Sequence, residues 1–123
     1  MMDLIIEQFI FWLESIVEDD PIPYEIQYVS FVYTKINSSF VLCVGGNEFK
    51  PNTNNIYDYF PLEAQYFNCP NLNSIKDELY YTNLIKTCID ESFSSCILKQ
   101  QFKNKLIYFG EYGKNLKFLF KVL

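Results

Sequence analysis

Apolar residues recur at helical spacing through the first part of the chain. This periodicity predicts an amphipathic helix from Asp3 to Glu18, which the prolines at Pro21 and Pro23 would end. The side expected to face the core carries Ile5, Phe9, Trp12, Leu13, Ile16 and Val17. The opposite side carries Glu7, Glu14 and Glu18. Leu4 and Phe11 project toward this acidic side, so either their placement is incidental or they mark a contact with a second molecule.

β-Branched and aromatic residues dominate the next part of the chain and predict strands. The first strand would run from Tyr24 to Ile36, and a turn at Asn37–Ser39 would return the chain into Phe40–Val44. A third strand would run from Ile56 to Phe67 with an interruption at Pro61, which is typical of a sheet edge or a bulge.

A second helical pattern runs from Ile75 to Ile97. Small polar residues at Ser92–Ser95 weaken it, so the region is predicted as either one helix or two. Two short apolar runs, Lys105–Phe109 and Leu116–Val122, then flank a turn that contains two glycines, and they predict a closing hairpin.

These elements together predict a single α+β domain over residues 1–123. We expect an antiparallel sheet of about five strands, with the N-terminal helix and the central helix or helix pair packed on one face. The other face of the sheet would be partly solvated.

Composition and charge exclude several classes of protein. Among the 123 residues 50% are apolar and 19% aromatic, which is enough to bury a full core and excludes a disordered chain. The net charge of −5 argues against binding to nucleic acid, because phosphates require clustered cations. All ten basic residues are lysines and there is no histidine, so no imidazole base, histidine metal ligand or guanidinium clamp is available.

The four cysteines form no CxxC pair, and we expect free buried thiols in a reducing cytoplasm rather than the alternative, a disulfide framework. No apolar run approaches the roughly 20 residues that span a bilayer. Asp3, Glu7 and Glu14 interrupt the apolar N-terminus, unlike a signal peptide. We therefore expect a cytoplasmic protein that does not bind membranes.

No pattern of residues predicts catalysis. The acidic pairs Asp19–Asp20, Asp77–Glu78 and Asp90–Glu91 are neighbours in sequence, which do not share a helical face, so we interpret them as solvated surface. Gly45–Gly46 follows a strand but lacks the lysine and the helix of a phosphate-binding loop. We expect no catalytic residue, metal or cofactor, and no enzymatic activity.

Binding to another protein is one interpretation of the abundant aromatic residues, and the alternative is that β-sheets are simply rich in tyrosine. Twelve phenylalanines and ten tyrosines exceed the needs of the core, and several tyrosines lie beside acids, which would suit a basic partner. The residues expected to contact this partner flank the polar loop and the third strand: Glu48, Tyr57, Asp58, Tyr59 and Glu63. The alternatives are a small-molecule-binding domain with an aromatic pocket between sheet and helices, and a self-associating structural protein that forms a homodimer through Leu4 and Phe11.

Four short pieces of the chain follow one another in a recognisable order: Phe11–Leu13, Pro21–Pro23, Phe40–Val44 and Phe109–Leu116. In these pieces and in the order of its elements, the chain resembles the small bacterial immunity proteins of polymorphic toxin systems. This resemblance implies a non-enzymatic protein that binds and neutralises a cognate toxin, often a basic nuclease.

Overall fold

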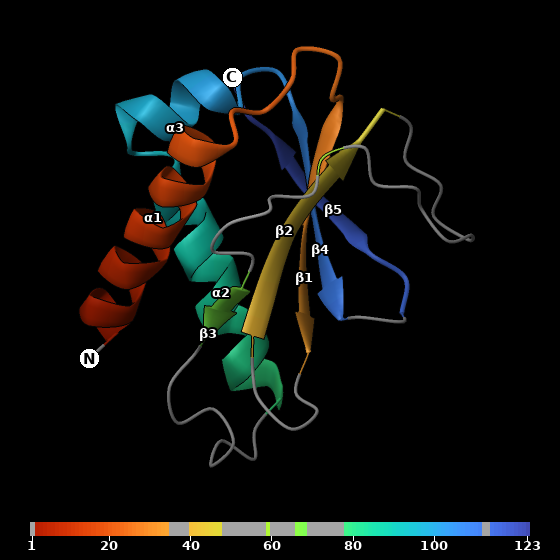
Figure 1. Cartoon of the computed structure of the whole chain (residues 1–123). Coiled ribbons are helices and arrows are strands. Elements are labelled where there is room, and N and C mark those ends of the chain that lie inside the picture. The colour runs from red at the N-terminus through yellow and green to blue at the C-terminus, as the bar shows by residue number, and fades with distance from the viewer. Residues whose placement is uncertain (1, 35–39, 48–58, 60–65, 69–77, 112–113) are drawn as a thin grey trace.

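The computed structural model describes residues 2–34, 40–47, 59, 66–68, 78–111 and 114–123 (Figure 1). Three helices and five strands lie within these residues. In chain order they are α1 (Met2–Asp19), β1 (Tyr28–Thr34), β2 (Phe40–Gly46), β3 (Tyr66–Asn68), α2 (Glu78–Ser92), α3 (Cys96–Gln101), β4 (Leu106–Glu111) and β5 (Lys117–Lys121). The predicted α+β class is therefore confirmed, and the central helical region is two helices.

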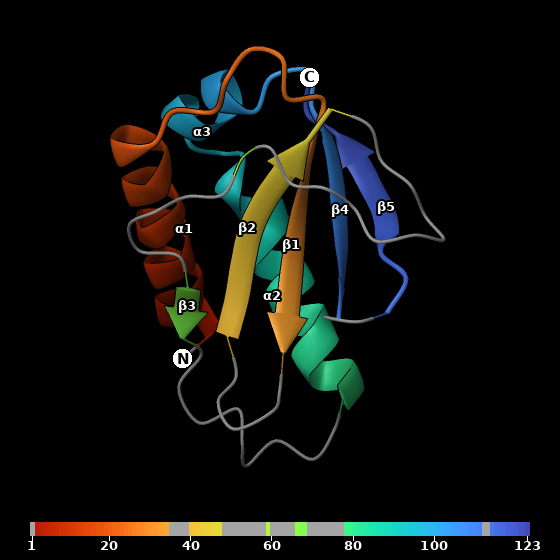
Figure 2. The same ribbon diagram turned by 45° about the vertical axis from the view of Figure 1, so that its right-hand side comes forward.

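The strands form one mixed sheet in the order β3-β2-β1-β4-β5, which can be followed in Figure 2. β1 pairs antiparallel with β2 and parallel with β4, while β4 and β5 form the predicted hairpin. The expectation of an antiparallel sheet is wrong at the β1–β4 pair. The chain leaves the sheet through α2 and α3 and returns at the end where β1 starts, and such a crossover produces parallel strands.

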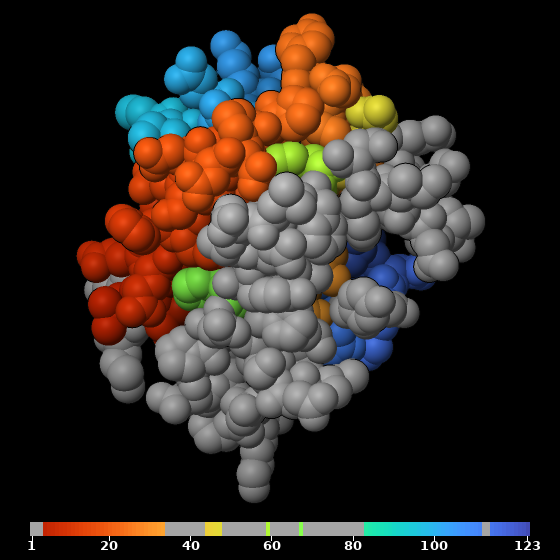
Figure 3. All heavy atoms as spheres, in the orientation of Figure 1, coloured from red at the N-terminus to blue at the C-terminus, as the bar shows by residue number. Residues whose placement is uncertain are grey.

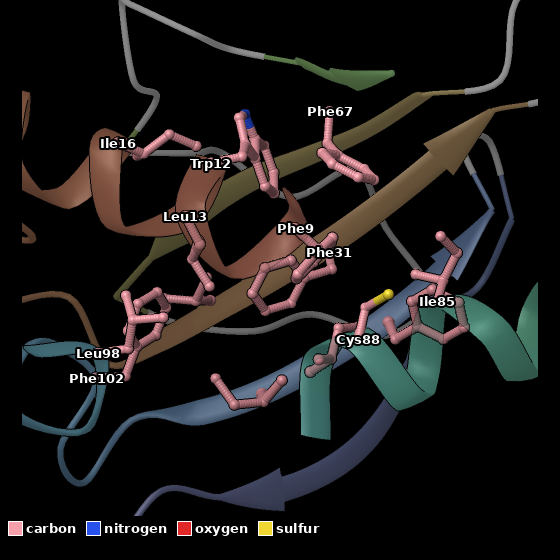
Figure 4. Packing of buried hydrophobic residues seen from close by; sticks show 14 of the residues in the cluster. Phe9, Trp12, Leu13, Ile16, Phe31, Phe67, Ile85, Cys88, Leu98 and Phe102 are labelled. Carbon is pink, nitrogen blue, oxygen red and sulfur yellow. The ribbon is translucent and has the colours of Figure 1, made fainter. Parts of the chain in front are cut away.

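All three helices lie on one face of the sheet, as the sequence predicts (Figures 1 and 2). Figure 4 shows how α1 inserts Phe9 and Leu13 into the core, where they meet Phe31 from the sheet and Cys88 from α2. The rings of Phe9 and Phe31 have centroids 6.0 Å apart. The space between sheet and helices, where an aromatic pocket was the alternative prediction, holds this packed cluster.

The opposite face of the sheet is also buried along its central strand. Tyr28, Ser30 and Val32 of β1 point to this face and are no more than 5% exposed. The face predicted to be partly solvated is therefore buried at β1. Tyr108 of β4 contacts the ring of Tyr28, with centroids 5.8 Å apart, and exposure rises toward β5, where Phe118 is 54% exposed.

Candidate binding surface on the first helix

The outer side of α1 exposes two large apolar side chains. Leu4 is 57% exposed and Phe11 is 73% exposed, although the neighbouring Phe9 and Leu13 are fully buried. Leu4 and Phe11 are seven residues apart, which places them on the same side of a helix with 3.6 residues per turn. The structure thus confirms that these two residues lie outside the core.

A groove of about 390 Å³ runs between this side of α1 and strand β3. It is lined by Leu4, Glu7, Gln8, Phe11, Trp12 and Phe67. In the space-filling view α1 forms the red flank of the molecule and borders the green atoms of β3 (Figure 3). The groove is open to solvent and mostly apolar, so it offers contact area to a second molecule.

The aromatic wall of the groove is held from inside the core. Phe9 packs against Trp12 and Phe67, with ring centroids 5.2 and 5.1 Å away, and Trp12 and Phe67 are 5.6 Å apart (Figure 4). Pairing of β3 with β2, in which Phe67 lies opposite Val41, brings Phe67 to this position. The groove therefore has a wall that is fixed by packing rather than by mobile surface side chains.

The charge of the chain is concentrated on α1. Five of its fifteen acidic residues lie in this helix, which has no lysine, so the ten acids outside α1 balance the ten lysines. Glu7 lines the groove, and Glu18 and Asp19 are exposed near the carboxyl end of α1. The helix dipole adds partial negative charge at that end. The surface around Leu4 and Phe11 is thus suited to a cationic partner.

Glu14 has a structural role instead. Its carboxylate accepts a hydrogen bond of 2.7 Å from the hydroxyl of Ser95, the N-cap residue of α3, and that hydroxyl accepts a bond from the backbone N–H of Leu98. This arrangement links α1 to α3 and places Glu14 away from the exposed acids.

Of the five residues predicted to bind a partner, the structure describes one, Tyr59. Glu48, Tyr57, Asp58 and Glu63 lie outside the described residues. Tyr59 is only 4% exposed: its backbone pairs with Gly45, and its hydroxyl donates a 2.8 Å hydrogen bond to the carbonyl of Asp20. Because its ring is buried and its hydroxyl is bonded to the backbone, we assign Tyr59 a structural role.

Four groove residues were not among the predicted contacts: Glu7, Gln8, Trp12 and Phe67. The spacing of Leu4 and Phe11 already indicated this side of α1. The position of Phe67 beside the helix depends on strand pairing across the sheet, which the local sequence does not encode.

Buried titratable groups occur away from the groove. Lys105 is buried, and its ammonium group donates a 2.6 Å hydrogen bond to the carbonyl of Ile26. Burial lowers the pKa of Lys105, an effect that the carboxylate of Glu25 opposes. Burial also raises the pKa of the Cys88 thiol to about 12, so this thiol is inert at neutral pH.

Other kinds of site find no support within the described ranges. These residues hold no group of three or more potential metal ligands among Cys, Asp and Glu. None of the helices described is long and apolar enough to cross a membrane. Cys88 and Cys96 are free thiols, whereas the side chains of Cys43 and Cys69 are outside the description.

Comparison with known proteins adds no relative: no protein-family model, curated protein or solved structure matches this chain.

Proposed function

We propose that this chain is a non-enzymatic protein-binding module, an immunity-like inhibitor that neutralises a basic toxin by covering it in the cytoplasm. The observation that carries the proposal is the exposed pair Leu4 and Phe11 on a helix that bears five acids and no lysine. Large apolar side chains surrounded by charge of one sign are typical of a surface that binds a partner of the opposite sign.

The proposed contact surface differs from the one expected from sequence. It centres on the groove of α1 rather than on Tyr59, which is buried. Glu48, Tyr57, Asp58 and Glu63 remain predicted contacts. Acid side chains would speed encounter with a basic partner, and Leu4 and Phe11 would supply the exposed apolar area that holds it.

Self-association through the same face is less well supported. In a two-fold homodimer built on Leu4 and Phe11, the acids of one α1 would face those of the other. Like charges in contact destabilise an interface, so the charge of α1 favours a different, basic partner over a second copy.

Affinity capture from lysate of the source cells tests the proposal. The tagged wild type is compared with a Leu4→Gln/Phe11→Gln variant and with Ile97→Gln as a matched control, because Ile97 is as exposed as Leu4 at 57% but lies on α3. The wild type and the control should retain one basic protein that high salt releases, and the double variant should lose it. The captured protein's activity is then assayed with and without this chain.

Two results would contradict the proposal. One is a captured partner that binds the double variant as tightly as the wild type. The other is a partner whose activity is unchanged when a stoichiometric amount of this chain is added.

A further inference from the structure

The two exposed apolar residues of α1 define a repeat distance. Phe11 lies seven positions after Leu4, which is about 10.5 Å along a helix that rises 1.5 Å per residue. Glu7 and Gln8 lie between them and line the groove together with Trp12 and Phe67. A partner side chain that enters between Leu4 and Phe11 therefore meets the aromatic wall.

A helix fits this repeat better than an extended strand does. Apolar side chains seven residues apart on a second helix recur at the same distance of about 10.5 Å, whereas side chains on one face of a strand recur about every 7 Å. Hydrogen bonding gives the same preference. The backbone of α1 is paired within the helix, so the α1 side of the groove offers no backbone partner to a strand, whereas a helix satisfies its own backbone.

The acidic residues of α1 indicate which polar residues the second helix would carry. Glu7 lines the groove, and Glu18 lies seven residues after Phe11, which continues the line of Leu4 and Phe11 toward the negative end of the helix dipole. A segment lying along α1 gains electrostatic energy from Lys or Arg beside these carboxylates.

We propose that the α1–β3 groove binds an amphipathic helical segment of the partner, with apolar side chains seven residues apart flanked by Lys or Arg. This inference rests on the proposed function and deepens it, because it specifies which kind of segment makes the contact. Helices docked in apolar grooves through such anchors are a recurrent mode of recognition.

Trp12 makes the inference directly measurable, because it is the only tryptophan of the chain and it lines the groove. Its fluorescence is titrated with three synthetic peptides of about 20 residues, long enough to form a helix. The first places Leu at helical spacing with Lys elsewhere. The second keeps the Leu positions and replaces Lys by Glu, and the third has the composition of the first with Leu at alternate positions. Calorimetry in parallel detects binding that leaves the emission unchanged.

We expect saturable binding of the helical Leu–Lys peptide only. Its affinity should fall about tenfold or more in the Leu4→Gln/Phe11→Gln variant, remain unchanged in Ile97→Gln and weaken with added salt. Glu7→Gln with Glu18→Gln should weaken binding and reduce its salt dependence.

Three results would overturn the inference: equal binding of the Leu–Glu peptide, equal binding of the alternating peptide, or no binding of any of the three. Each leaves the proposed function open to its own test. Another result is the capture of a cellular partner in a way that depends on Leu4 and Phe11, although the contact is made through a non-helical segment of the partner's own chain. That result would support the proposed function and reject this inference.

Discussion

The thiol of Cys88 couples folding to pH at the scale of a single residue. Burial raises its pKa to about 12 in the folded chain, from 9.0 for an unperturbed thiol. Below pH 9 both the folded and the unfolded state keep the proton. Between pH 9 and pH 12 only the unfolded state loses it, so the free energy of unfolding falls as pH rises.

We therefore predict a difference in pH dependence between the wild type and Cys88→Ala. From pH 8 to pH 10 the free energy of unfolding should fall by about 1.4 kcal/mol more in the wild type, since only it contains this buried thiol. Urea denaturation at each pH measures the difference. The rest of the chain is the same in both proteins and its pH dependence cancels, so parallel pH curves would show that Cys88 is not buried as described.

The environment of Gly45 dictates its identity. It pairs with Val29 on one side and with Tyr59 on the other, and an added Cβ would lie 2.7 Å from the backbone oxygen of Tyr28. Backbone in the middle of a sheet cannot move aside without breaking hydrogen bonds. The strand is therefore restricted to glycine at this position.

Gly45→Ala should lower the free energy of unfolding by about 1–3 kcal/mol, the usual cost of overpacking a core. Gly110→Ala is the matched control, because the one atom closer than 3.0 Å to its added Cβ is the end of the Leu116 side chain, whereas backbone atoms of Leu116 and Asn115 lie 3.2 and 3.3 Å away. The control should cost less. Equal stability losses in the two variants would contradict the assigned environment of Gly45.

At the scale of elements, Ser95 connects two helices. Its hydroxyl accepts from the N–H of Leu98 at the start of α3 and donates to Glu14 of α1. Ser95→Ala should lower the free energy of unfolding by about 1 kcal/mol through the lost N-cap. Ser94→Ala is the control and should cost less, because the exposed hydroxyl of Ser94 bonds only to the carbonyl of Glu91 in the described contacts. A double-mutant cycle with Glu14→Gln measures the link between helices, and a coupling energy of zero would contradict it.

The sequence predicts an element when the signal is local. The buried side of α1 follows from its 3.6-residue periodicity, and the β4–β5 hairpin from two apolar runs around a glycine turn. The parallel pairing of β1 with β4 joins residues far apart in the chain, and no local pattern encodes it. One signal was present: Tyr28–Tyr33 is apolar except at Ser30, which indicates a strand buried on both faces.

The candidate site likewise contains residues that the local sequence predicts and residues that only strand pairing places. Leu4 and Phe11 stand out because they break the helical pattern. The polar residues around Tyr59 indicate an exposed strand, but the backbone of Tyr59 pairs with Gly45 and its ring is buried. Phe67 reaches the groove only through the β2–β3 pairing.

At the scale of the whole molecule, the chain is electrically uneven. The excess negative charge equals the charge of α1, and Lys117 and Lys121 lie in β5 on the far edge of the described sheet. Under the proposed function, this separation would orient a basic partner toward α1 during encounter and make the association rate depend on ionic strength.

The same unevenness predicts that the isolated chain does not dimerise through α1. Sedimentation over a wide concentration range should show a monomer, because a two-fold contact would place acid against acid. A concentration-dependent dimer that Leu4→Gln/Phe11→Gln abolishes would show that the apolar contact outweighs the repulsion.

The most direct test of the account is photo-crosslinking in the source cells. A benzophenone amino acid is placed at position 11, in the groove, or at position 97, on α3, in otherwise identical chains. We predict that position 11 crosslinks one basic protein and that position 97 does not. A partner that crosslinks from position 97 and not from position 11 would contradict the assignment of the binding surface to α1.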